Sequence, residues 1–472
     1  MLQPSQYAST PVATLLHEAA RGTIGFDQRV FDAIVARPEE AGAALLAHGM
    51  NPPEDSRFEI DADIVNLLAA LPQVDALEYI VKILREGFED LPVSFVTVVR
   101  ALGERAVQPL VDVYTEMEED ASGEVAFLLA SMGIRDAKIQ KLIEDRLEYD
   151  MEDGAMLAGL YGDKALLPRL ETLLREVGKN REVEFAIETL KSDAPPVPEP
   201  PFDPRSEYPE TSLPAFDMLE DREIFQLAME HEEVATRLEA LDILEDLELS
   251  SAFVKPLLDV ATGEANLELR AAAWRTLNRL SQVSEVRKAA ETTFEDASLP
   301  RQVRVAALIT LLPKYPLAKW KPSLQEFLDD AGSRADAVQA MWRSREPVFG
   351  SSFGVFLDDP DLKVRIQAIR GAGVMGDKTS IAKLRVAFAD EDMRKDALFA
   401  YAMAVPSEVS ASRMRSLLKR IDEESGGLQP NEAMNVQLAL DMRLEAAGKA
   451  PIFFPDEEED GHVHGPNCGH VH

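Results

Sequence analysis

The residues best suited to chemistry lie at the C-terminal end of the chain. Residues 462–472 hold four of the seven histidines and the only cysteine: His462, His464, Cys468, His470 and His472. Imidazole nitrogen and thiolate sulfur are good ligands for zinc, nickel or copper(I), and four such donors satisfy a tetrahedral ion. An acidic run at residues 456–460 precedes them and raises the local concentration of cations. We therefore predict that the tail binds a transition metal reversibly, zinc or nickel.

Two observations limit this prediction. A SEC-C-type zinc motif needs several cysteines, and this chain has one, so that motif is excluded. Without a packed shell of supporting residues, such a tail would exchange its metal readily and discriminate poorly between metals. The alternative is a solvated tail with no physiological ligand.

A second motif suggests a nucleophile. Gly350, Ser352 and Gly354 match the Gly-x-Ser-x-Gly pattern of a nucleophile elbow. That turn must follow a buried strand and needs Asp and His partners further along the chain. The flanking residues 342–347 and the helical segment that follows do not fit a strand, so we expect a polar turn between helices.

The remaining candidates are isolated. His17, His48 and His231 are far apart in sequence and lack a neighbouring Cys, Ser or carboxylate set, so we interpret them as surface or packing residues. Three tryptophans could form an aromatic ridge that docks a peptide, although core packing is the preferred interpretation. The tryptophans are Trp274, Trp320 and Trp342. We predict no catalytic residue.

The elements that carry these residues form a repeat. Six times in the second half an arginine is followed three residues later by alanine, at intervals of 29 to 34 residues. A period of this size is typical of a solenoid of stacked helix pairs. The arginines are Arg237, Arg270, Arg304, Arg334, Arg365 and Arg394.

The first half carries its own version of the period. Gly103, Gly133 and Gly162 each follow an apolar segment and precede a short charged turn, with intervals of 30 and 29 residues. Glycine at such a place supplies the left-handed residue that ends a helix. The apolar segments 93–102, 124–132 and 154–161 are predicted inner helices, whereas 138–147 and 165–176 have the one-sided stripe of outer helices.

The sequence predicts an all-α solenoid of antiparallel helix pairs in two arrays. Residues 195–214 contain eight prolines, which block helix continuation, so we predict a connector there, either draped over the repeats or free. Residues 1–74 fit the repeat less well and are predicted to form a helical cap, with an ankyrin-like unit near residues 45–52 as the alternative. The predicted segments are 1–74 (cap), 75–192 (first array), 193–216 (linker), 217–450 (second array) and 451–472 (acidic, His/Cys-rich tail).

Composition narrows the choice of partners. The 472 residues include 84 acidic and 49 basic ones, for a net charge of −35. This charge repels nucleic acid and anionic membranes, and it favours a basic or amphipathic protein or a metal cation. No stretch approaches the roughly 18 apolar residues of a membrane helix, and the N-terminus lacks the basic region of a signal peptide. A single cysteine fits a reducing compartment, so we expect a cytoplasmic protein.

Residues 102–110, 162–170 and 361–377 resemble HEAT repeats, in particular the short type found in phycobilisome bilin lyases. The resemblance covers about residues 75–191 and 230–405 and implies a curved stack of helix pairs. It also implies a ladder in which an arginine and an acidic residue join neighbouring repeats. The six arginines match the ladder position, and the acidic partner is clearest at Asp361, whereas Asn266 and Leu299 hold the corresponding place elsewhere.

These patterns predict a non-enzymatic scaffold or adaptor that binds a protein partner and carries a metal-binding tail. The first alternative is a metallochaperone or metal buffer that delivers zinc or nickel to a client. A bilin-lyase-like enzyme is the second alternative, and only the repeat subtype suggests it.

Overall fold

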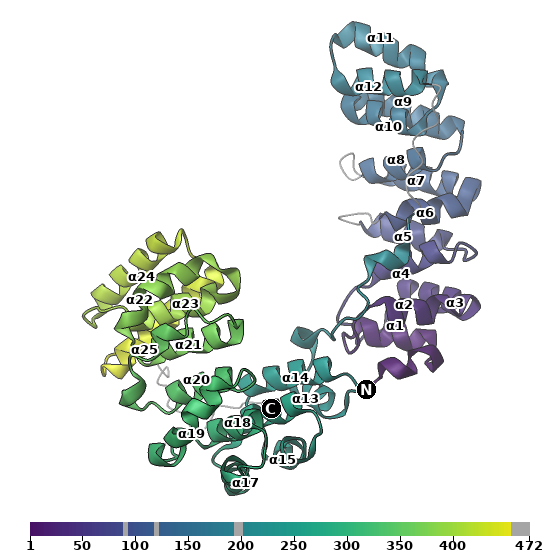
Figure 1. The fold of residues 1–472 in the computed structure, drawn as a ribbon. Coiled ribbons are helices and arrows are strands. Elements are labelled where there is room, and N and C mark those ends of the chain that lie inside the picture. The colour runs from purple at the N-terminus through teal and green to yellow at the C-terminus, as the bar shows by residue number, and fades with distance from the viewer. Residues whose placement is uncertain (88–92, 118–121, 193–201, 455–472) are drawn as a thin grey trace, which may run out of the picture. The chain divides into compact units, whose positions relative to one another are not determined.

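The computed structural model describes residues 1–87, 93–117, 122–192 and 202–454 (Figure 1). Within these ranges all regular structure is helical, which confirms the predicted all-α solenoid. The chain divides into two compact units, Met1–Thr236 and Arg237–His472. None of the helices in the described ranges is long and apolar enough to cross a bilayer.

Unit 1 contains the first thirteen α-helices. They are α1 (Val12–Ala20), α2 (Gln28–Val35), α3 (Pro38–Met50), α4 (Asp61–Ala70), α5 (Leu77–Glu86), α6 (Ser94–Leu102), α7 (Val107–Glu116), α8 (Gly123–Ser131), α9 (Ala137–Tyr149), α10 (Met151–Tyr161), α11 (Leu167–Val177), α12 (Arg181–Lys191) and α13 (Asp221–Glu230).

The boundary between the units falls within α14, and unit 2 contains most of α14 and all the helices that follow it. They are α14 (Val234–Asp246), α15 (Val254–Gly263), α16 (Leu267–Leu277), α17 (Ser284–Glu295), α18 (Arg301–Leu311), α19 (Leu317–Asp329), α20 (Arg334–Arg343), α21 (Leu362–Val374), α22 (Ile381–Val386), α23 (Glu391–Ala404), α24 (Ala411–Ser425) and α25 (Pro430–Ala446).

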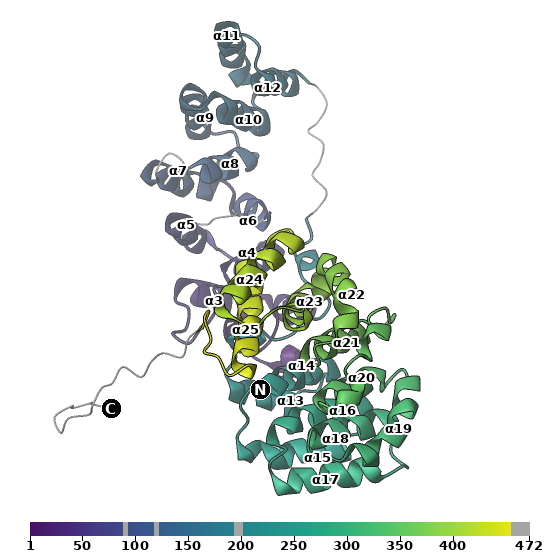
Figure 2. The same ribbon diagram turned by 90° about the vertical axis from the view of Figure 1, so that its left-hand side faces the viewer.

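The helices of unit 1 alternate between two layers. Helices α4, α6, α8, α10 and α12 pack one against the next and form the inner layer, while α5, α7, α9 and α11 form the outer layer (Figure 2). Helix α8 is an example of an inner helix. Six of its nine residues are buried, because other helices pack against it on several sides. The predicted inner segments lie in α6, α8 and α10, and the predicted outer segments lie in α9 and α11.

The three glycines that mark the period end these inner helices. Gly103, Gly133 and Gly162 have φ angles of 65°, 74° and 70°, which side chains with a Cβ rarely adopt. Short 3-10 turns follow two of them, at Gly103–Ala106 and Lys164–Leu166. Unit 2 uses the same arrangement at Gly376, which has φ 62° and precedes the turn Lys378–Ser380.

The first 70 residues are helical and lead directly into the array. Helix α1 packs on α3, α2 on α4, and α3 on α5, so the stack begins near the N-terminus. Residues 45–50, at which an ankyrin-like unit was the alternative, lie within α3.

The described part of the proline-rich segment lies against unit 1. The Tyr208 ring packs against Phe26 and Phe31 at centroid distances of 5.0 and 5.5 Å, and its hydroxyl accepts a hydrogen bond from Asn66 Nδ2 at 3.2 Å. Arg205 forms an ion pair with Asp32 on α2 at 2.7 Å. Residues 202–208 are therefore draped over the N-terminal helices, and residues 193–201 lie outside the described ranges.

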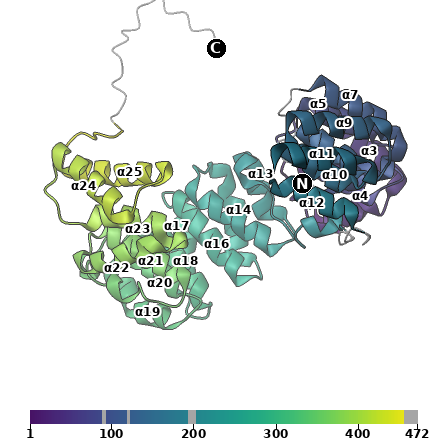
Figure 3. The same ribbon diagram turned by 90° about the horizontal axis from the view of Figure 1, so that it is seen from above.

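Unit 2 has the same two layers. Helices α16, α18, α20, α21, α23 and α25 pack in succession as its inner layer (Figure 3). Helices α15, α17, α19, α22 and α24 each pair with the inner helix that follows and form the outer layer. Between α20 and α21, two 3-10 turns, Pro347–Phe349 and Phe353–Val355, replace an outer helix.

Candidate functional site

The repeated arginines occupy equivalent places in unit 2. Five of the six are the fourth residue of an inner or equivalent helix, and Arg334 is the first residue of α20. From there five of the six guanidinium groups donate to a carbonyl oxygen near the end of the preceding outer helix or turn, where the helix itself offers no partner. The distances are 3.2 Å from Arg270 Nε to Ala261 O, 3.1 Å from Arg304 Nε to Phe294 O, 2.7 Å from Arg334 Nε to Leu328 O, and 2.9 Å from Arg365 Nη1 to Asp359 O and from Arg394 Nη1 to Phe388 O.

Four of these arginines also join one repeat to the next. Arg237 pairs with Glu264 at 2.8 Å, and Arg394 pairs with Glu432 at 2.6 Å. Each guanidinium donates a hydrogen bond to the ionised form of its carboxyl partner and so lowers the pKa of Glu264 and of Glu432. The other two pairs are Arg334 with Asp359 at 3.5 Å and Arg304 with Glu326 at 3.7 Å, so four of the six arginines have the acidic partner that the resemblance implies.

One predicted member of the ladder has a different role. Among the described ion pairs, none joins Asp361 to an arginine. Its carboxylate instead accepts a hydrogen bond from the Lys363 backbone N–H at 2.8 Å and caps the N-terminus of α21. The acidic partner lies two residues earlier, at Asp359. The expectation was wrong on this point because the Asp361 carboxylate is held by a backbone N–H of its own helix.

The most unusual electrostatic feature of unit 2 is a cluster of four charged residues, formed by Glu245 on α14, Arg275 on α16, and Asp336 and Arg343 on α20. Arg343 Nη2 donates to Glu245 Oε1 at 2.9 Å, and Arg275 Nη1 lies 3.2 Å from Asp336 Oδ2. Both pairs skip α18, which packs between α16 and α20. Since packed helices lie about 8–10 Å apart, direct contact across an intervening helix requires the inner layer to curve sharply here.

Burial perturbs all four charges of this cluster. It raises the pKa of Asp336 and of Glu245, and the neighbouring arginines oppose the change only in part. It also lowers the pKa of Arg343, with Arg279 and Arg370 adding to the effect and Glu245 opposing it. Burial also tends to lower the pKa of Arg275. The negative charges of Asp336 and Glu245 have the larger combined effect, so the pKa of Arg275 is raised. Burying these four charged groups therefore costs desolvation free energy, which their ion-pair partners offset.

Two side-chain amides complete the cluster. With the amide of Gln339 oriented so that its oxygen faces Arg343, that oxygen accepts from Arg343 Nε and Nη2 at 3.2 Å. The amide of Asn278, turned in the same sense, donates to Ile309 O on α18 at 3.2 Å. Arg279 Nε donates to Glu245 O at 2.7 Å. The network thus ties α14, α16, α18 and α20 together.

This cluster was not predicted from the sequence. The available signal was the segment 334–343, an inner helix that carries Asp336 and Arg343 among alanines, valine and methionine. Charged residues in a helix that packs on several sides need partners, but no spacing rule links position 343 to position 245.

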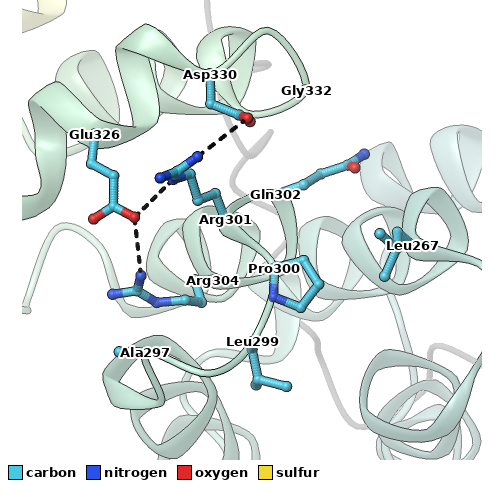
Figure 4. A pocket seen from close by; sticks show the side chains of 10 residues that line it. All are labelled: Leu267, Ala297, Leu299, Pro300, Arg301, Gln302, Arg304, Glu326, Asp330 and Gly332. Carbon is cyan, nitrogen blue, oxygen red and sulfur yellow. Dashed lines mark hydrogen bonds and ion pairs between the residues drawn. The ribbon is translucent and has the colours of Figure 1, made fainter.

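A shallow pocket of about 450 Å³ opens where the start of α18 faces the end of α19 (Figure 4). Arg301 pairs with Glu326 at 2.8 Å and with Asp330 at 3.8 Å, and Arg304 lies 3.7 Å from Glu326. The Arg304 guanidinium also lies 5.4 Å from the Phe327 ring centroid. The lining contains no serine, cysteine or histidine, so the polar groups that the pocket offers are mainly the paired side chains of Arg301, Arg304, Glu326 and Asp330.

The predicted metal ligands His462, His464, Cys468, His470 and His472 lie outside the described residues. In the ranges that the structure does describe, no group of three or more His, Cys, Asp or Glu side chains is arranged to hold a metal ion.

The other sequence candidates have structural roles. Residues 350–354 lie in the turns between α20 and α21, as expected, and the Phe353 side chain is buried against Gly371. His48 and His231 are buried, and burial lowers the pKa of both imidazoles. His17 lies at the surface, 3.4 Å from Asp55.

The tryptophans do not form one exposed ridge. Trp274 and Trp320 are fully buried in the core of unit 2, which confirms the packing interpretation for both. Trp342 is half-buried, and its Nε1 donates to Gln367 Oε1 at 3.1 Å.

No protein-family model matches the chain, and no curated protein matches it. Among solved structures, one similar chain comes from work on tubulin recruitment and assembly by microtubule polymerases with tumor overexpressed gene (TOG) domain arrays. It is 12% identical, with a TM-score of 0.20 over 80% of this chain and 98% of the other. An engineered protein is 14% identical, with a TM-score of 0.18 over 92% and 99%. At these TM-scores neither structure carries an argument about this protein.

Proposed function

We propose that this protein is a non-enzymatic helical-repeat scaffold that binds a protein partner along its inner helices. The observation that supports this best is the unbroken succession of inner helices in each unit, which offers one surface over several repeats. Solenoids commonly use such extended surfaces for binding. The net charge of −35 favours a basic or amphipathic partner, and the single cysteine fits a reducing compartment such as the cytoplasm.

Photo-crosslinking in the full chain tests this proposal. A benzophenone amino acid replaces one exposed inner residue in each unit, Phe185 on α12 or Val374 on α21. The matched controls are exposed outer residues of the same units, Val177 on α11 and Val386 on α22. We expect a discrete protein adduct from at least one inner position and none from the outer positions. Equal adducts from both layers, or none from either, would overturn the proposal.

We also propose that the C-terminal tail binds zinc or nickel reversibly. The support is the donor set of four histidines and one cysteine that follows an acidic run. Titration calorimetry of zinc and nickel into the full chain should give about one ion per chain. The variant that changes all five donors to serine should not bind, and unchanged binding by this variant would contradict the proposal.

A metallochaperone would need both activities at once. If the crosslinked partner is captured only when the tail is loaded with metal, the scaffold and the tail act together, and delivery of metal to that partner becomes the preferred function. If capture of the partner does not depend on metal, only the scaffold function is supported.

A further inference from the structure

The inner layer of unit 1 exposes apolar side chains at one repeat position. Phe127 on α8, Met156 on α10 and Phe185 on α12 are 29 residues apart, the same interval that separates Gly133 from Gly162. Their exposed fractions are 39%, 52% and 70%. We call these three residues the apolar row.

Burial shows that the three side chains point to the same surface. If a row residue is position i, then positions i−2, i+1 and i+2 are buried in all three helices. Helices α8, α10 and α12 therefore bury the same face and expose the same face. These helices also pack in direct succession along one side of the unit (Figure 2). On α6 the equivalent position is Thr97, so the apolar row begins at α8. Leu160, one turn after Met156 and 37% exposed, widens it on α10.

A second row runs beside the first. Three residues before each member of the apolar row stands a carboxylate, at Glu124, Asp153 and Glu182. Residues three apart are neighbours on a helix surface, so the acidic row flanks the apolar row on all three helices. Asp153 is held by Arg146 at 2.6 Å, and Glu182 at the end of the row is exposed.

These two rows specify the chemistry of an occupant. Contiguous exposed apolar side chains, two of them aromatic, are typical of interaction sites on a protein surface. Glu182, the exposed member of the acidic row, and the net charge of −35 disfavour nucleic acid, anionic lipid and a second copy of this acidic chain, and they attract lysine and arginine. An occupant therefore needs an apolar stripe with basic residues at its side.

Spacing favours a helix as that occupant. Neighbouring inner helices lie about 8–10 Å apart, which sets the distance between members of the apolar row. Seven residues of an α-helix rise about 10.5 Å, so a helix with an apolar residue at every seventh position matches the row. The inner helices offer no free backbone groups for an extended strand, whereas a helix satisfies its own backbone hydrogen bonds.

We propose that the apolar and acidic rows of unit 1 bind a basic amphipathic helix of a partner protein, laid across α8, α10 and α12. This inference rests on the proposed scaffold function and names the surface and the class of partner. About two heptads would span the three row residues, because the two intervals between them add to roughly 20 Å.

A designed peptide tests this site directly. The probe is a fluorescein-labelled 21-residue helix with leucine along one face, lysine beside it and alanine elsewhere, and its binding to the full chain is measured by fluorescence anisotropy. The first control peptide has the same composition in scrambled order, and the second has glutamate in place of lysine. We expect saturable binding of the probe and at least tenfold weaker binding of both controls.

Variants at exposed positions locate the binding. Phe185→Ser and Met156→Ser should each weaken probe binding at least tenfold, while Val177→Ser on the outer helix α11 should leave it unchanged. Glu182→Gln should weaken binding several-fold at low salt and have less effect at high salt, with Glu176→Gln on α11 as its control. All five positions are exposed, so the variants should fold, and circular dichroism checks this.

The outcomes separate the two proposals. Absence of probe binding, equal binding of the scrambled peptide, or undiminished binding to Phe185→Ser and Met156→Ser would overturn the assigned site. The scaffold proposal would survive that result if Val374 in unit 2 still gave a protein adduct, and it would fail if no inner position did.

Discussion

Arg343 on α20 donates a hydrogen bond to Glu245 on α14, at 2.9 Å and across 98 residues of sequence. The two helices are not neighbours in the repeat, so this pair fixes how sharply the inner layer of unit 2 turns. Because both groups are largely buried, each depends on the other to offset the loss of water. This pair is therefore one of the contacts that hold α14 and α20 in their places in unit 2.

Removing one partner should therefore destabilise unit 2. Arg343→Met leaves the Glu245 carboxylate without its main partner, and we expect a loss of about 3 kcal/mol in the free energy of unfolding. The double variant Arg343→Met with Glu245→Leu should recover most of that loss, because it replaces the pair by apolar groups. All three tryptophans lie in unit 2, so urea unfolding followed by tryptophan fluorescence reports on this unit.

The control for this experiment is Arg385→Met, which removes an exposed arginine 3.7 Å from Glu424. Exposed pairs of this kind contribute about 0–1 kcal/mol. If Arg343→Met unfolds at the same urea concentration as this control, the cluster does not stabilise the inner layer.

The arginine ladder gives a local prediction. Arg394 donates to Phe388 O, Gly427 O and Glu432, and lysine cannot reproduce that fork of donors. Arg394→Lys should loosen the junction between α24 and α25 by about 1–2 kcal/mol. Hydrogen exchange of the backbone amides at residues 425–432 should accelerate correspondingly. The control Arg415→Lys lies on an exposed face of α24, and equal acceleration in both variants would show that Arg394 has no special role.

Unit 1 should lose stability as the pH rises through a defined range. Burial raises the pKa of Asp63 from 3.8 to about 6, although a hydrogen bond from Tyr208 opposes the change. The folded state therefore holds a proton that the unfolded state releases between pH 4 and pH 6. The contribution of Asp63 to stability is greatest below this range and falls across it, by at most about 3 kcal/mol for a shift of this size.

The variant Asp63→Asn removes this titration and should stabilise unit 1 at pH 7.5. Unit 1 has no tryptophan, so urea unfolding is followed by far-UV circular dichroism, with tryptophan fluorescence recorded in parallel to identify the contribution of unit 2. Glu39→Gln, at an exposed position of α3, is the control. If Asp63→Asn has the same pH dependence as the wild type, Asp63 does not titrate in this range.

Much of the fold could be predicted from the sequence because the signals were local. Gly133 and Gly162 each end a helix through a positive φ, which only the residue type and its neighbours determine. The regular arginines mark inner helices for a similarly local reason, since five of the six bond to a carbonyl within ten residues. Asp361 was assigned the wrong role because both a cap and a ladder partner require an acidic residue near the start of a helix.

The rest depended on contacts that no period reveals. Tyr208 packs on Phe26 and Phe31, about 180 residues away, so composition alone could not decide between a draped and a free connector. The pairing of Arg343 with Glu245 depends on curvature, which arises from small rotations accumulated over several repeats. The metal-binding prediction concerns residues outside the described ranges and stays a prediction.

The most direct test of the scaffold proposal is co-purification of the crosslinked partner with four single variants of the full chain. Two variants change the inner layer, Phe185→Ser and Val374→Ser, and two change the outer layer, Val177→Ser and Val386→Ser. All four positions are exposed, so each variant alters the surface and leaves the core intact. We predict that the partner is lost from at least one inner variant and retained by both outer variants. Retention by both inner variants, or loss from an outer one, would contradict it.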